Sequence, residues 1–152
     1  MSLIDFIEIE TGGTAVKFGE LSVGRHYVSG ISNSTRALFA GGSNPYTNAM
    51  EYITIASTGN AADFGDIFTG RYSVSSCSNS NRAVFLGGRT TSPSVVYYNA
   101  MEFVTISTTG NTSDFGDITG AATGSQGGAA GRAVAGSKYE VKPNNGDIKV
   151  IY

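Results

Sequence analysis

The sequence is poor in the residues that most often carry chemistry. Among its 152 residues are one cysteine, one histidine and no tryptophan, and only 14% are charged. A single cysteine excludes a disulfide within the chain and a cluster of thiolate metal ligands. A single histidine removes most catalytic triads and histidine-based metal centres. We therefore expect a protein that is not an enzyme, has no cofactor and is stabilised by packing.

Net charge and long apolar runs are also scarce. The formal net charge is −2 and the basic residues do not cluster, so the sequence lacks the basic surface with which proteins bind nucleic acids or anionic membranes. No apolar run approaches the roughly twenty residues that span a bilayer. Residues 1–5 lack the basic and apolar start of a secretory signal. We expect a protein made in a cytoplasm, without a nucleic-acid or membrane partner.

Glycine, in contrast, is abundant. The 21 glycines stand beside 40% hydrophobic residues, many of them β-branched or aromatic. This balance is typical of short strands joined by tight turns. The chain length suits one hydrophobic core. The composition thus predicts a single all-β domain over residues 1–152.

An internal repeat organises this domain. Residues 52–67 recur closely at 103–118, and again with more substitutions at 6–21. Self-similarity of this kind is the signature of a repeat architecture, in which each unit packs on its neighbours. We divide the chain into three units, which span approximately residues 3–47, 48–98 and 99–152.

Three phenylalanines mark one position in the repeat: Phe18, Phe64 and Phe115. Their spacings are 46 and 51 residues, and the five extra residues fall between Arg89 and Asn99. Surface loops tolerate added length of this kind. We therefore expect an exposed loop between Arg89 and Asn99, and phenylalanines that are buried at equivalent places in successive sheets.

Each unit contains four short strand signals bounded by glycine, asparagine or serine. The best-defined set comprises residues 71–77, 82–86, 100–106 and 115–118. Val104 and Ile106 face one side of the predicted sheet and Phe103 faces the other, so neither face is fully wet. Such a four-stranded antiparallel sheet suits stacking between two neighbours, as in the blades of a β-propeller. The alternative is a three-sheet β-prism that closes within one chain.

Paired glycines close an apolar strand in two units, and an aromatic residue follows on the next strand. The pairs are Gly41 and Gly42 before Tyr52, and Gly87 and Gly88 before Phe103. This pattern resembles the kelch repeat of β-propellers, without the tryptophan of that repeat. Residues 53–66, with the sequence Ile-Thr-Ile-Ala-Ser-Thr-Gly-Asn-Ala-Ala-Asp-Phe-Gly-Asp, resemble the repeats of virion proteins of tailed phages, particularly marine ones.

The resemblance implies a structural component of a phage particle, such as a capsid decoration or tail appendage, located in the virion. Its partners would be other virion proteins and copies of itself. One alternative is a glycan-binding adhesin, or tail-fibre module, in which Tyr46, Tyr97 and Tyr98 would stack on sugars of the host surface. A kelch-type oxidase is the third class, although one histidine and one cysteine do not supply the usual copper ligands.

Acidic residues recur beside glycine in two units, as Asp63 and Asp66 and as Asp114 and Asp117. Their oxygens, together with an asparagine three positions earlier, could hold a calcium ion. The first unit has Lys17 at an equivalent position, and a lysine there would repel a cation. We therefore expect these side chains to accept backbone hydrogen bonds in tight turns.

Arginine recurs at two positions of the unit. Arg25 and Arg71 share one, and Arg36, Arg82 and Arg132 share the other. A ring of guanidinium groups could bind an anionic sugar. The planar guanidinium also suits pairing with a carboxylate of a neighbouring unit, for example Glu51 or Asp66, and we expect this structural role.

The first and last strand signals of the sequence are of the same type. Residues 148–152 resemble the strand that contains Tyr52. We expect them to pair beside residues 3–10, either of a partner copy in a six-bladed dimer or of the same chain in the prism. Either pairing would hide two exposed sheet edges.

Overall fold

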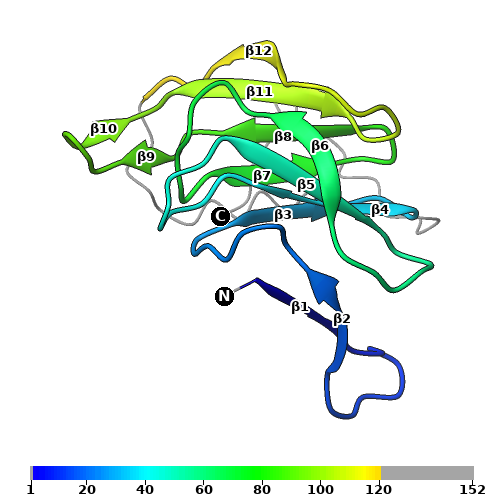
Figure 1. The fold of residues 1–152 in the computed structure, drawn as a ribbon. Helices are drawn as coiled ribbons and strands as arrows, with labels where there is room; N and C mark the ends of the chain where they lie inside the picture. The colour runs from blue at the N-terminus through cyan, green and yellow to red at the C-terminus, as the bar shows by residue number, and fades with distance from the viewer. Residues whose placement is uncertain (1, 121–152) are drawn as a thin grey trace.

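A computed structural model describes residues 2–120, and this part of the chain is all-β (Figure 1). It contains twelve strands and no helix, which confirms the predicted fold class. Residues 2–120 accordingly hold no helix long and apolar enough to cross a membrane. The expectations for Arg132 and for the strand at 148–152 lie outside the described residues.

Two antiparallel sheets of four strands each form the body of the protein, and in both the strands pair in chain order. The first sheet consists of β3 (Ser29–Ser32), β4 (Arg36–Ala40), β5 (Ala49–Thr54) and β6 (Ala62–Asp66). The second consists of β7 (Ser75–Ser78), β8 (Arg82–Leu86), β11 (Ala100–Thr105) and β12 (Ser113–Asp117). This is the four-stranded antiparallel unit that the spacing of the strand signals predicts.

A two-stranded hairpin precedes these sheets and repeats their last two strands. It pairs β1 (Leu3–Phe6) with β2 (Val16–Glu20), and its register shifts after the second pair. The hairpins β5–β6 and β11–β12 have the same register and the same shift. Each four-stranded sheet therefore joins the last two strands of one sequence unit to the first two strands of the following one.

The extra residues of the second unit form a small hairpin of their own. It pairs β9 (Arg89–Thr90) with β10 (Val96–Tyr97), and residues 91–97 are exposed. The insertion lies in a surface loop, as expected, and leaves the two sheets unchanged in strand order.

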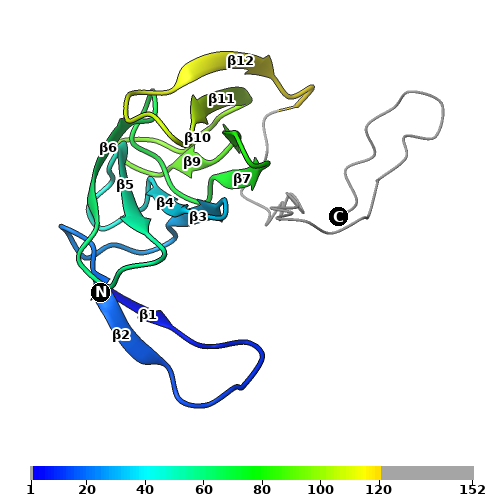
Figure 2. The same ribbon diagram turned by 90° about the vertical axis from the view of Figure 1, so that its right-hand side faces the viewer.

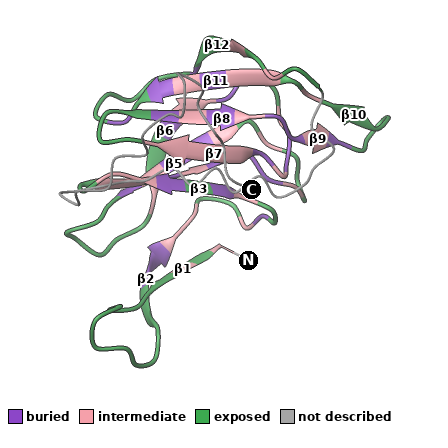
Figure 3. Cartoon of the chain, turned by 180° about the vertical axis from the view of Figure 1, so that it is seen from behind, coloured by how far each residue is buried: buried purple, intermediate pink, exposed green. Residues whose placement is uncertain are grey.

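The core lies between the two sheets (Figure 3), because alternate side chains of each strand point to the same face. The first sheet contributes Leu38, Ala40, Met50 and Phe64, and the second contributes Ala83, Phe85, Val104 and Ile106. Each large apolar side chain buried in this layer stabilises the fold by about 1.5–3 kcal/mol. Stacking of the sheets thus supplies most of the hydrophobic contact.

The three repeated phenylalanines differ in burial. Phe64 is 1% exposed and Phe18 is 9% exposed, but Phe115 is 49% exposed. The expectation of a buried Phe115 is therefore wrong in the described part of the chain. The physical reason is its position: Phe115 packs on Phe103, on the face of the second sheet opposite to the core residue Val104, and no described sheet covers that face.

Candidate functional site

The arginines that precede each four-stranded sheet form buried ion pairs. Arg25 Nη1 lies 2.7 Å from Glu51 Oε2, and Arg71 Nη2 lies 2.5 Å from Glu102 Oε1. The side chains of all four residues are at most 4% exposed. Glu51 also accepts the N–H of Ser22. The expected pairing with a carboxylate of the neighbouring unit is confirmed for Arg25 and Arg71, with Glu51 and Glu102 in place of Asp66. These two guanidinium groups are therefore buried against carboxylates of the fold.

The paired glycines give these arginines room. A Cβ on Gly42 would lie 3.0 Å from Arg25 Cδ, and one on Gly88 would lie 3.3 Å from Arg71 Cδ. The φ angles of the two glycines, +127° and +91°, also favour glycine. The glycine pairs therefore have a local cause in this protein, because each accommodates a buried arginine.

The second set of arginines behaves differently. The guanidinium of Arg36 lies 4.5 Å from the centre of the Tyr52 ring, and that of Arg82 lies 4.7 Å from the Phe103 ring. Arg36 also donates to the carbonyl oxygen of Ile106. Within residues 2–120 neither arginine forms an ion pair, so the expected carboxylate pairing is wrong for Arg36 and Arg82. Cross-strand aromatic rings take the place of the carboxylates.

The turns of the hairpins β5–β6 and β11–β12 each dock on the edge strand of the sheet before them, and we call this contact a seam. In the first seam Gly59 N–H donates to Phe18 O at 2.9 Å, Ala61 N–H donates to Glu20 O, and Glu20 N–H donates to Asn60 Oδ1. The second seam repeats these three hydrogen bonds between residues 110–112 and residues 64–66. The recurring Gly-Asn turn is thus an inter-sheet connector.

The recurring acidic residues do not converge on a cation. Asp114 accepts the N–H of Gly116, as expected for a tight turn. Asn60 and Asn111, however, accept hydrogen bonds across the seams and not within their own turns. The carboxylates of Asp63, Asp66 and Asp117 join no group of three or more histidine, cysteine or acidic side chains placed for a metal within residues 2–120.

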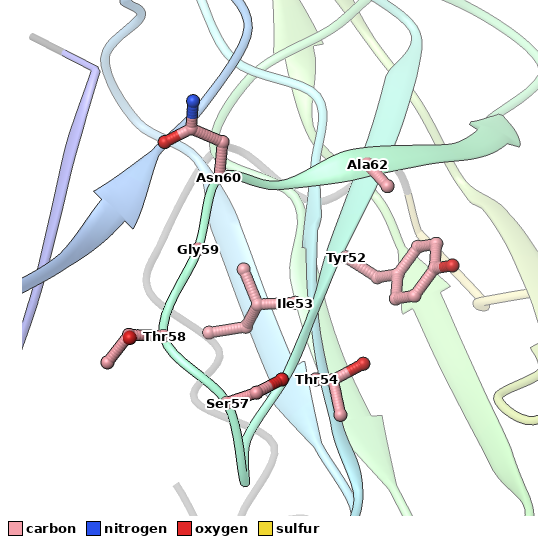
Figure 4. Close-up of a pocket in the computed structure, with 8 residues that line it drawn as sticks. All are labelled: Tyr52, Ile53, Thr54, Ser57, Thr58, Gly59, Asn60 and Ala62. Atoms are coloured by element: carbon pink, nitrogen blue, oxygen red, sulfur yellow. The ribbon is translucent and has the colours of Figure 1, made fainter.

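A small hollow of about 150 Å³ lies inside the β5–β6 turn (Figure 4). Thr54, Ser57 and Thr58 line it, and Asn60 points out of it towards β2. Ligand pockets usually exceed about 300 Å³. The hollow is therefore a feature of the turn and smaller than the usual ligand pocket.

Aromatic side chains gather where the loop after β4 meets the inserted hairpin. The ring of Tyr72 stacks on that of Tyr46 with 5.6 Å between centroids, and the ring of Tyr27 lies 5.5 Å away on a tilted plane. A hydrogen bond also joins the hydroxyl groups of Tyr46 and Thr91. Tyr27 is 68% exposed. Two of the three rings, Tyr27 and Tyr46, are exposed and Tyr72 lies buried between them; we call these three residues the tyrosine cluster.

Arg89 adds a positive charge to the tyrosine cluster. Its guanidinium lies 5.2 Å from the centre of the Tyr72 ring, and hydrogen bonding to Tyr97 raises its pKa above the usual value. Tyr97 is partly exposed, whereas Tyr98 is half-buried with its ring 5.4 Å from the buried Arg71. Of the three predicted glycan contacts, Tyr46 and Tyr97 lie at the tyrosine cluster. Tyr98 instead contacts Arg71 of the buried ion pair with Glu102.

Sequence reasoning missed Tyr27, Tyr72 and Arg89 as members of this surface. The sequence signal was the repeat: Tyr72 and Arg89 occupy the positions of His26 and Ser43 one unit earlier, and the structure pairs the backbones at both places. An arginine directly after a glycine pair thus faces the aromatic residue that follows the repeated Gly-Arg. Cys77, half-buried at the position equivalent to Ile31, has a thiol whose pKa is raised by burial, as expected of a packing residue.

Comparison with known proteins adds no assignment. No protein-family model matches the chain, and no curated protein is similar to it.

Proposed function

We propose that this protein is a non-enzymatic structural component of a phage particle, built from stacked kelch-like sheets. The observation that supports the structural role is the use of the recurring polar residues. Arg71 and Glu102 pair with each other, and Asn60 and Asn111 bind the neighbouring edge strand. The recurring polar residues thus stabilise the fold, because their contacts join strands and sheets to one another.

The phage location rests on the resemblance of residues 53–66 to virion repeats, and this segment recurs at 104–117. The residues that carry the resemblance also have a structural role, since Gly59 and Asn60 make the hydrogen bonds between neighbouring sheets. A particle component needs a rigid surface and neighbours to bind. We propose that the sheets are propeller blades, and that the partners are other virion proteins and further copies of this chain.

The test is mass spectrometry of purified particles from the source phage. We expect peptides of this chain at a constant ratio to the major capsid protein through successive gradient purifications. A non-structural phage protein of similar abundance in the lysate serves as the control and should fall away. Equal depletion of both proteins would refute the virion location.

A glycan-binding module is the second candidate, and the tyrosine cluster favours it. Exposed aromatic rings beside a fixed cation suit the apolar face and the acidic groups of sugars. A glycan array with the wild-type chain should show binding that Tyr46→Ala and Tyr97→Ala reduce. Phe68→Ala, which removes an exposed aromatic residue outside the cluster, should leave binding unchanged. An array without signal would reject this candidate.

A further inference from the structure

Strand β12 has the backbone of a seam edge, but no seam turn from residues 2–120 docks on it. The equivalent strand β6 contains Gly65, where a Cβ would lie 2.3 Å from the carbonyl oxygen of Gly110. Gly116 occupies the same position in β12, yet a Cβ there would meet only Met101 Cε, at 3.8 Å, among the described atoms. Both glycines have φ in the range that favours glycine, +138° and +116°. Gly116 is thus shaped for the approach of a turn.

The side chains around β12 are also more exposed than their counterparts around β6. Phe115 is 49% exposed, whereas Phe64 on β6 is 1% exposed. Met50, on the sheet face that packs in the core, is fully buried, whereas the equivalent Met101 is only half-buried. The second sheet covers this apolar face in the first sheet. The equivalent face of the second sheet is left uncovered by residues 2–120.

The N-terminal hairpin carries a turn of the kind that docks at a seam. Ten positions separate the last paired residues in each hairpin: Phe6 and Val16, Tyr52 and Ala62, and Phe103 and Ser113. Gly13 therefore corresponds to Gly59 and Gly110. Residues 12–15 are exposed, and a Cβ on Gly13 would touch nothing within 4 Å.

The free turn and the free edge lie at opposite ends of the described chain. Figure 2 shows the hairpin β1–β2 at one end of the row of sheets and β12 at the other. Within one copy the turn is therefore remote from the edge that it fits. A second copy can supply it without distortion of either sheet.

We propose that copies of this chain associate head to tail, with the turn at residues 13–15 of one copy docked on residues 115–117 of another. By the register of the two internal seams, Gly13 N–H donates to Phe115 O and Ala15 N–H donates to Asp117 O. Asp117 N–H donates to the Thr14 hydroxyl, which replaces the asparagine side chain. The inference rests on these contacts and is independent of the phage location.

A contact of this kind is heterologous, since it joins two different surfaces and leaves one of each free on the pair. Copies must therefore close into a ring or extend into a filament. The hairpin β1–β2 also brings its exposed Ile7 and Ile9, which correspond to the buried Val104 and Ile106, to the apolar face of the neighbouring copy.

The first test compares the mass of the full-length wild type with that of Phe115→Ser, by light scattering over a range of concentrations. We expect the wild type to be a dimer or larger, and the substitution to raise the dissociation constant about tenfold or more, as loss of one buried phenylalanine implies. The matched control is Phe68→Ser, which removes an exposed phenylalanine that is not part of β12 and should associate like the wild type. A monomeric wild type, or a Phe115→Ser chain that associates like the wild type, would overturn the proposal.

The second test identifies the surfaces with single cysteines in a Cys77→Ala background. A Thr14→Cys chain and an Asp117→Cys chain should form a disulfide when mixed and oxidised, and neither should form one alone. Glu20→Cys with Asn60→Cys in one chain is the internal control, because these residues make the equivalent seam contact. If the control pair links and the mixed chains do not, the proposal fails. It also fails if a doubly substituted Thr14→Cys and Asp117→Cys chain links only within itself as a monomer, because residues of the same copy would then cover β12.

Discussion

The two buried arginines differ in how completely their nitrogens are bonded. Arg71 donates to Gly87 O, Thr69 O and Glu102, whereas Nε and Nη2 of Arg25 have no hydrogen-bond partner in the described structure. Glu102 in turn accepts from Phe68 N–H and the Thr112 hydroxyl. The second copy of the ion pair is therefore the better satisfied of the two.

We expect Glu102→Ala to lower the free energy of unfolding by on the order of 3–5 kcal/mol, because it leaves an uncompensated buried charge. Glu51→Ala should cost less, since Arg25 is already incompletely bonded. Lys17→Ala, which breaks an exposed ion pair with Glu20, should cost less than about 1 kcal/mol. Urea denaturation of the three variants tests this order, and a Glu102→Ala chain as stable as the Lys17→Ala chain would contradict it.

The acidic turns are expected to need no metal ion. Asn60 and Asn111 already accept N–H groups, and Asp114 accepts Gly116 N–H. A ligand that binds only the folded state raises the melting temperature, so its removal lowers that temperature. We expect a calcium chelator to leave the melting temperature unchanged. A fall of several degrees that added calcium reverses would make Asp63, Asp66, Asp114 and Asp117 the ligands to test.

At the scale of the elements, two glycines of the first seam differ in whether the structure has room for a side chain. A Cβ on Gly19 would lie 1.8 Å from Gly59 O, whereas one on Gly59 would meet nothing within 4 Å. Neither has a φ that favours glycine. Gly19→Ala should therefore open the seam and Gly59→Ala should not, although the two residues face each other.

The loss on Gly19→Ala should be about 2–4 kcal/mol, from three hydrogen bonds worth roughly 0.5–1.5 kcal/mol each. Gly59→Ala should be neutral or stabilise by up to about 1 kcal/mol, because alanine restricts the unfolded chain. Thermal denaturation measures both, and hydrogen exchange should show faster exchange of Ala61 N–H in Gly19→Ala alone. Equal effects of the two substitutions would refute the seam geometry.

The strands could be predicted from the sequence because their signals are local and recur in each unit. The sheet that joins β7 and β8 to β11 and β12 could be predicted too, because its four strand signals follow one another along the chain. Burial of Phe115 was misjudged, since a repeat position does not show whether a neighbour covers it. Tyr27 and Tyr72 meet through tertiary contact, which no spacing along the chain indicates.

At the scale of the whole molecule, each sheet is linked to the next by the same set of contacts, so stability should be the sum of similar increments. We expect a chain with a second copy of residues 20–65 inserted after Gly65 to fold with one more four-stranded sheet. Every seam in that chain keeps a native turn and a native edge. Its β-type circular dichroism should grow in proportion to length, with a melting temperature at least equal to that of the wild type. A chain that aggregates or melts earlier would show that the sheets are not interchangeable.

The two seams have the same three hydrogen bonds, although the loop between their two partners is five residues longer in the second. Most of these bonds use main-chain groups, which every amino acid possesses. The loop after β8 can therefore change in length and composition while the sheets keep their mutual fit. Natural variants of this protein should accordingly diverge fastest around Tyr97 and slowest at Gly19 and Gly65, so that the outer surface can adapt to new contacts without a new fold.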